Sequence, residues 1–231
     1  MEKPQAVIVG AGEGLSAAVA RELAPDHALT LAAREGARMR EVAEETGART
    51  ALLDATDEDA VAGLFDALPA PPRVVVYNPS ARVRGQLTGL AVADVRRAIE
   101  VTALGGFLTG KHAARRMLAA EPVAGVRGTI LFTGASAGVK GFPHSAPFAM
   151  GKFAQRGLAE SMARELHPRG IHVAWINIDG AIRNPGRKEP ADAPDSMLDP
   201  AAIARTYRHL IEQDRSAWTQ EVALRPWVER F

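Results

Sequence analysis

The chain has 231 residues, of which 47% are hydrophobic and 24% charged, and its net charge is +1. This near-neutral charge disfavours a nucleic-acid partner, and the absence of cysteine excludes disulfides, thiolate metal sites and cysteine nucleophiles. The scattered histidines show no metal-ligand spacing. Neither a secretory signal nor an apolar run of about 18 residues is present, so we expect a cytoplasmic protein without a membrane or metal partner.

Short apolar runs alternate with longer amphipathic ones along the chain. The runs rich in Val, Ile and Leu predict buried strands at 5–10, 28–33, 49–54, 73–78, 128–134 and 171–178, with an edge strand at 218–224. Helical periodicity covers 14–24, 36–46, 57–68, 91–119, 147–166 and 200–213. This alternation predicts one α/β domain over 1–231, a doubly wound parallel sheet of the Rossmann type. The proline-rich segment 183–199 predicts a lid loop over a substrate or cofactor.

A glycine-rich turn separates the first strand from the first helix. Gly10, Gly12 and Gly14 lie where a pyrophosphate approaches the N–H groups at a helix N-terminus, and side chains there would block that approach. The pattern therefore predicts a dinucleotide site. The alternative is a tight βα turn with no ligand.

The end of the second strand indicates which dinucleotide binds. A site for NAD(H) usually has Asp or Glu at this point, to hold the ribose hydroxyls, whereas this strand ends at Arg34. A guanidinium suits a 2′-phosphate, so we expect NADP(H) in preference to NAD(H). The alternative is a solvated arginine, and Glu13 and Glu35 nearby would oppose a further phosphate.

Several motifs in order then resemble those of the short-chain dehydrogenase/reductase family, over nearly the whole chain. Gly10 and Gly14 match the family's glycine turn, with Ser16 in place of its last glycine, while Asp54 follows the third strand and Asn78 the fourth. The family's Pro-Gly pair after the sixth strand corresponds to 179–180, which is Asp-Gly here. The resemblance implies cofactor contacts from Gly10, Gly12, Gly14, Leu15, Arg34, Asp54, Ala55, Asn78, Lys152, Gly180 and Ile182.

The catalytic set of the family is incomplete in this chain. The family uses Asn, Ser, Tyr and Lys, and only Lys152 matches. Phe148 occupies the tyrosine position, Ala135 the serine position and Thr102 the asparagine position, while Ser136 lies one residue from the serine position. Phenylalanine carries no proton, and loss of general acid catalysis costs about 10²–10⁴ in rate.

Other side chains near these positions are candidate proton donors. His144 comes first because its usual pKa suits proton transfer near neutral pH. Its alternative is an ordinary loop histidine, and Ser145 and Asp179 have alternative roles as caps of a helix and a turn. The further candidates are Ser136, Thr133, Ser145 and Asp179.

Two functions remain open. The first is an atypical NADP(H)-dependent oxidoreductase acting on an unknown small-molecule carbonyl or alcohol, or reducing an enoyl bond. The second is a catalytically silent NADP(H)-binding module or sensor. In the family, the helices that correspond to 91–119 and 147–166 pair across a two-fold axis, so the resemblance implies a homodimer or homotetramer.

Overall fold

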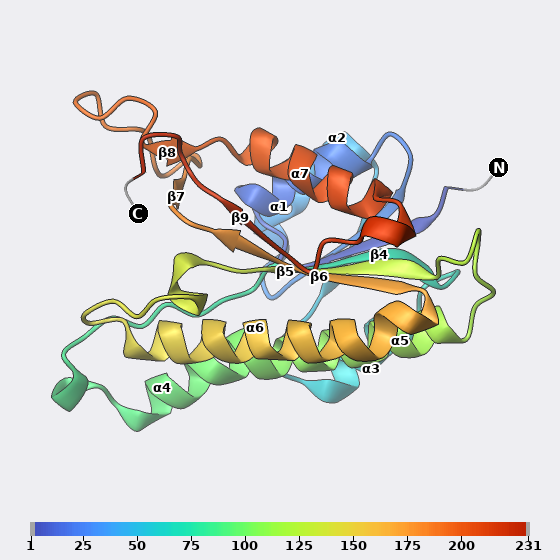
Figure 1. Cartoon of the computed structure of the whole chain (residues 1–231), viewed down its shortest axis with the longest axis horizontal. Helices are drawn as coiled ribbons and strands as arrows, with labels where there is room; N and C mark the ends of the chain where they lie inside the picture. Colours follow the sequence, from blue (N-terminus) through green and yellow to red (C-terminus); the bar gives the residue numbers. More distant parts are fainter. Residues whose placement is uncertain (1–2, 230–231) are drawn as a thin grey trace.

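The computed structural model describes residues 3–229, and one seven-stranded parallel sheet runs through the molecule (Figure 1). The strand order is β3-β2-β1-β4-β5-β6-β9, so the chain winds outward from β1 in both directions. The strands are β1 (Gln5–Val9), β2 (Ala28–Ala33), β3 (Arg49–Leu52), β4 (Pro72–Tyr77), β5 (Gly128–Thr133), β6 (Ile171–Ile178) and β9 (Glu221–Leu224). The predicted doubly wound α/β sheet is therefore confirmed, and the predicted edge strand pairs in parallel with β6.

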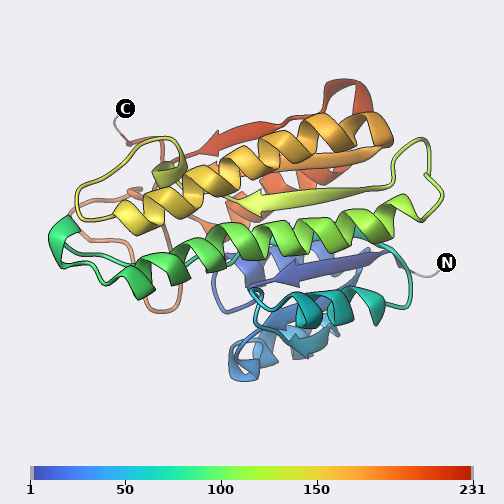
Figure 2. The same ribbon diagram turned by 90° about the horizontal axis from the view of Figure 1, so that it is seen from below.

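Helices cover both faces of this sheet (Figures 1 and 2). On one face lie α1 (Leu15–Leu23), α2 (Arg40–Thr46) and α7 (Pro200–Glu212). On the other lie α3 (Glu58–Asp66), α4 (Val92–Ile99), α5 (Gly105–Leu118) and α6 (Ala146–Leu166). Every residue of β1, β5 and β6 is buried, because each of these strands is covered from both sides.

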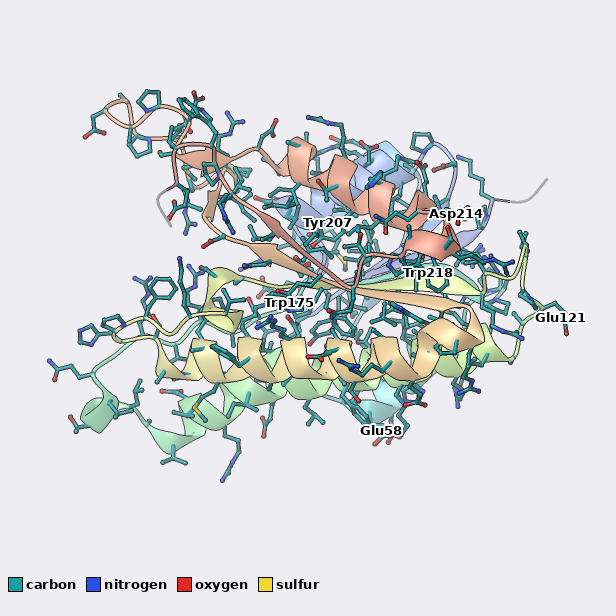
Figure 3. All side chains as sticks on the ribbon, in the orientation of Figure 1. Glu58, Glu121, Trp175, Tyr207, Asp214 and Trp218 are labelled. Carbon is teal, nitrogen blue, oxygen red and sulfur yellow. The ribbon has the colours of Figure 1, made fainter. Side chains whose placement is uncertain are left out.

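Two aromatic side chains mark the two cores on either side of the sheet (Figure 3). Trp175 of β6 lies on the side of α6, and Tyr207 of α7 lies on the opposite side. Both side chains are fully buried. The two apolar layers hold the strands in place, and the strand ends can therefore carry irregular loops.

Two predicted helices differ in detail from the observed ones. The predicted helix 36–46 begins as a 3-10 turn, Gly36–Arg38, and becomes α-helical only from Arg40. The predicted helix 91–119 is α4 and α5 joined by a π-helical turn, Glu100–Leu104. Such turns admit one extra residue and are frequent at functional sites. Here the turn contains Thr102, which is fully buried.

A short second sheet lies beyond the carboxyl end of β6. It pairs β7 (Ala181–Ile182), directly before the predicted lid segment 183–199, with β8 (Met197–Leu198), which lies near the end of that segment. In Figure 1 this segment is the orange loop beside β7 and β8, at the same end of the molecule as the loop that precedes α6.

Candidate active site

Three cavities lie in a row outside the carboxyl ends of the strands. In an open α/β sheet this edge, where the strand order reverses beside β1, is where ligands bind. The first cavity, of about 330 Å³, borders the ends of β1 to β4. The second, of about 260 Å³, lies between the first helical turn of α1, β5 and α6. The third, of about 520 Å³, lies beyond α6 and borders the loops that follow β4, β5 and β6.

The predicted cofactor residues all line the first or second cavity, except Gly12. The candidate catalytic residues are divided between two cavities. Lys152 lines the second cavity, whereas Ser136 and His144 line the third. Phe148 borders both. The first cavity includes Gly10, Arg34, Asp54, Ala55 and Asn78, and the second includes Gly14, Leu15, Asn78, Gly180 and Ile182.

The glycine turn requires glycine at position 10 for two reasons. Gly10 has a φ of +80°, and a Cβ on it would lie 2.7 Å from the ring of Pro79. The side-chain amide of Asn78 donates to the Gly10 carbonyl at 3.2 Å. At the next turn the Gly12 N–H donates to the Ser16 hydroxyl at 2.9 Å, so Ser16 closes the turn where the family has glycine. The N-terminus of α1 therefore faces the second cavity with little side-chain bulk.

The first cavity carries one arginine without a carboxylate partner. Arg38 pairs with Glu35 at 2.9 Å, which offsets part of the opposition expected from that glutamate. Glu13 is exposed and does not line the cavity. Arg34 makes no ion pair within residues 3–229. A free guanidinium at this point fits the phosphate that the sequence predicts.

Asp54 closes the other side of the first cavity. It accepts hydrogen bonds from the Thr56 N–H at 3.0 Å and from Arg97 at 2.8 Å. Partial burial alone would raise the pKa of Asp54, but these bonds outweigh it and hold the pKa at about 2. The carboxylate therefore stays ionised and fixed in orientation at neutral pH.

Lys152 is the central polar group of the second cavity. Only 2% of its surface is exposed, and its Nζ donates to the Thr133 carbonyl at 2.5 Å and to Oε1 of Gln155 at 3.2 Å. Burial, together with the nearby charge of Arg82, lowers the pKa of Lys152 to about 7. At this pKa the ammonium and the neutral amine are both populated near neutral pH.

Gln155 is a site residue that the sequence analysis missed. It is fully buried one helical turn after Lys152, and its amide donates to the Thr102 carbonyl at 3.2 Å. Its Oε1 also accepts from the indole N–H of Trp175 at 3.3 Å. The available signal was a polar residue on the buried face of a helix, three positions after the lysine. Gln155 fixes both the lysine and the π-helical turn.

The three altered catalytic positions lie beside Lys152 or its hydrogen-bond network. Phe148 is 7% exposed and the guanidinium of Arg82 lies 4.6 Å from its ring centre. Ala135 lines the second cavity and carries no polar group. Thr102 lines none of the three cavities, and its hydroxyl accepts from the Ala81 N–H at 3.3 Å. The lysine is therefore kept, while the phenol and the serine hydroxyl are absent.

His144, the first candidate proton donor of the sequence analysis, lies in an exposed loop. It is exposed, has a φ of +60° and lines the third cavity together with Ser136. Its carbonyl accepts from the Gly85 N–H at 3.1 Å, which joins the loop before α6 to the loop after β4.

Asp179 and Thr133 already form other polar contacts, and Ser145 does not cap the helix as its alternative role expected. Asp179 lies between Lys140 at 3.7 Å and Arg225 at 3.5 Å, so its carboxylate is held between two cations. The Thr133 hydroxyl shares a hydrogen bond of 2.7 Å with the phenol of Tyr207. Ser145 is buried at the start of α6, and its side chain makes no capping bond there.

The segment 183–199 contains a tight turn that reaches the cavities. The backbones of Asn184 and Arg187 bond to each other in both directions, and the Asn184 side chain accepts from the Gly186 N–H at 2.9 Å. Asn184 and Arg187 both line the second cavity. The predicted lid segment thus contributes to the site, and its closure remains a prediction.

The family model described as short chain dehydrogenase matches residues 4–189. The chain belongs to the short-chain dehydrogenase family. It is 34% identical over 212 residues to cis-4-hydroxycyclohexanecarboxylate dehydrogenase of Sinomonas cyclohexanicum, covering 88% of this chain and 83% of the relative. A short-chain dehydrogenase structure from Rhodopseudomonas palustris is 34% identical with a TM-score of 0.79, covering 96% and 99% of the two chains.

A second solved structure carries a nucleotide. The alcohol dehydrogenase of Thermococcus sibiricus, complexed with 5-hydroxy-NADP, is 25% identical with a TM-score of 0.83, and the match covers 99% of each chain.

Within residues 3–229, no helix combines the length and apolarity needed to cross a membrane. The same residues contain no cluster of three metal-ligating side chains.

The buried lysine gives a testable pH dependence of stability. The pKa of Lys152 falls from 10.5 in the unfolded chain to about 7 in the folded one. The folded state therefore opposes the charged form, and this penalty is complete below pH 7 and is relieved as the pH rises towards 10.5. Relative to Lys152→Met, the wild type should gain about 2 kcal/mol of unfolding free energy between pH 7 and pH 9. Urea denaturation at several pH values measures this gain.

Lys188→Met is the matched control, because Lys188 is exposed and lines none of the three cavities. Its stability should follow that of the wild type across the whole pH range. If the Lys152→Met and wild-type curves run parallel, the lysine is not held with a lowered pKa.

Proposed function

We propose that the chain is an NADP(H)-dependent oxidoreductase that interconverts a small-molecule carbonyl and alcohol, or reduces an activated double bond. The observation that carries this proposal is the continuity of the site: cavities run from the unpaired Arg34, past the glycine turn, to the buried Lys152. Family membership supports the reaction class. The NADP derivative in the Thermococcus structure supports the choice of nucleotide.

The residues present fit NADP(H) along both cavities. Gly10, Gly12, Gly14 and Leu15 would hold the pyrophosphate at the N-terminus of α1, whose first N–H groups have no acceptor within the helix. A Cβ on Gly10 would fill this turn.

Different groups would bind the adenine end and the nicotinamide end of the cofactor. Arg34 would bind the 2′-phosphate, while Asp54 and Ala55 would border the adenine. Towards the reacting end, Lys152 would hold the ribose. The remaining contacts there would come from Asn78, Gly180 and Ile182.

The bound nicotinamide supplies or accepts the hydride, and the chain has to manage the proton. Lys152 is the group we assign to proton exchange, because it lines the same cavity as the glycine turn and its pKa is about 7. In carbonyl reduction its ammonium would give a proton to the oxygen that becomes the hydroxyl. Phe148 forms the apolar wall that the phenol occupies in the family.

Cofactor choice should depend on Arg34. The wild type should bind NADPH at least tenfold more tightly than NADH, because a charge-assisted phosphate contact contributes about 1.5–3 kcal/mol. Arg34→Asp should reverse this preference, since the carboxylate repels the phosphate and accepts from the ribose hydroxyls. Isothermal titration measures both affinities. Equal affinities of the wild type for the two nucleotides would refute the role of Arg34 in selecting NADPH.

The proton assignment is tested by kinetics on a panel of aldehydes, ketones and enones. Lys152→Met should lower kcat at saturating NADPH by about 10² or more. The wild-type kcat for reduction should fall as the pH rises through 7, because the ammonium loses its proton. His144→Ala is the comparison variant. If kcat falls in His144→Ala and not in Lys152→Met, the proton comes from His144.

Phe148→Tyr tests whether the lost phenol alone limits the activity. Restoring it should not raise kcat, because Ala135 and Thr102 leave the phenol without its partners and catalytic groups that act together are non-additive. A large gain from this single change would contradict the account.

The second candidate function is a silent NADP(H)-binding module or sensor, and the specific observation that favours it is the loss at positions 102, 135 and 148. The kinetic panel separates the two functions. Tight NADPH binding without oxidation of NADPH by any member of the panel favours the module, and turnover of any member favours the enzyme.

We further propose that the chain forms a homodimer or homotetramer in the cytoplasm. Apolar side chains of the α5 and α6 layer are close to half exposed, which is costly for an isolated chain. Leu104 is 44% exposed, Phe107 47%, Met150 50% and Phe153 45%. A complete lack of cysteine is compatible with a reducing compartment.

A further inference from the structure

The third cavity carries an excess of positive charge. Arg82, Arg84 and Arg187 line it, and none of the three forms an ion pair within residues 3–229. Lys140 also lines it and is balanced by Asp179, which contacts Arg225 as well. Glu229 is the remaining carboxylate of the lining. Among residues 3–229, three unpaired guanidinium groups therefore face a single free carboxylate.

Separate parts of the chain bring these arginines together. Arg82 and Arg84 belong to the irregular segment after β4, which the bond from the Gly85 N–H to the His144 carbonyl fixes against the loop before α6. Arg187 comes from the turn that Asn184 closes. Figure 2 shows the loops after β4 (green) and before α6 (yellow) at one end of the molecule, together with the orange loop that follows β7.

Phe148 positions the first of these guanidinium groups. Arg82 lies 4.6 Å from the ring centre, a favourable cation–π arrangement that holds its planar group at the border between the second and third cavities. A guanidinium therefore lies over the ring that replaces the family's tyrosine.

The arginines also oppose each other. Burial, followed by the charges of Arg84 and Arg187, lowers the pKa of Arg82. Gathering like charges in a partly buried cavity costs free energy, and a bound anion relieves that cost. The planar fork of arginine matches the two oxygens of a carboxylate or phosphate.

The pyrophosphate of the cofactor does not account for the whole cluster. Arg82 and Arg187 line both the second and the third cavity, so they border the glycine turn as well. Arg84 and Lys140 line the third cavity alone. With about 520 Å³, the third cavity has the size of a small-molecule site and lies directly beside Phe148.

We propose that the third cavity binds the anionic oxygen group, a carboxylate or phosphate, of the organic substrate, with Arg84 as the residue that selects for this charge. This inference rests on the proposed oxidoreductase function and names its substrate class. Arg82 and Arg187 bind the same group from the cofactor side of the cavity.

The test uses benzoate, phenyl phosphate and neutral benzamide as probes, titrated by ligand-observed NMR with and without saturating NADP⁺. With NADP⁺ present, at least one anion should bind the wild type about tenfold or more tightly than benzamide. The stronger of the two anions identifies the carboxylate or the phosphate as the preferred group.

Arg84→Gln should weaken anion binding about tenfold and leave the affinities for benzamide and NADP⁺ unchanged. Lys188→Gln is the matched control: it removes one exposed positive charge beside Arg187 that lines none of the three cavities. This control should bind every probe as the wild type does.

Four results would overturn the proposal: benzamide binding as tightly as the anions, displacement of the anions by NADP⁺, no effect of Arg84→Gln, or an equal effect of Lys188→Gln. The second result would assign the arginines to the cofactor. Failure of NADP⁺ itself to bind would refute the proposed function, and the titrations without NADP⁺ would still decide whether Arg84 binds an anion.

Discussion

The burial of one ammonium group constrains the whole site. Lys152 of α6 points its amine at the end of β5 without a carboxylate partner among residues 3–229, so its charge depends on the Thr133 carbonyl and on Gln155. Gln155 in turn is held by Thr102 and Trp175. The π-helical turn, α6, β5 and β6 are therefore coupled through one amine. Removing any partner would leave a buried polar group unsatisfied, which is costly.

Polar and aromatic groups still surround the position of the lost phenol. Phe148 keeps the aromatic ring without the hydroxyl, and the Arg82 guanidinium lies over that ring. A guanidinium does not release a proton at physiological pH, but it stabilises negative charge on oxygen. In the function we propose, Lys152 exchanges the proton, and the arginines recognise the negative charge of the substrate.

Much of the fold could be predicted because strand and helix periodicities differ clearly in this chain. Fully apolar runs such as 171–178 predicted strands that are indeed buried on both faces. The π-helical turn within 91–119 could not be predicted, because it depends on the packing of Thr102 against Gly151, where an added Cβ would lie 2.9 Å from the threonine Cβ. Hydrophobic periodicity shows which face of a helix is buried, but it does not reveal the one extra residue that a π-helical turn contains.

The site was predictable where it follows the strand ends and less so where loops meet. Gly10, Arg34 and Asp54 lie beside the same cavity because parallel strands end at one edge. Gln155 and the cluster of Arg82, Arg84 and Arg187 were missed. Their proximity depends on tertiary contacts, such as the bond from Gly85 to His144, that join loops far apart in the sequence.

Above all, we propose that this chain binds NADP⁺ in a site built around Arg34 and Lys152. A crystal structure of the protein soaked with NADP⁺ tests this most directly. We predict the 2′-phosphate within hydrogen-bonding distance of the Arg34 guanidinium and a ribose hydroxyl at the Lys152 amine. Cavities that stay empty at saturating NADP⁺, or a nucleotide whose 2′-phosphate lies away from Arg34, would contradict the account.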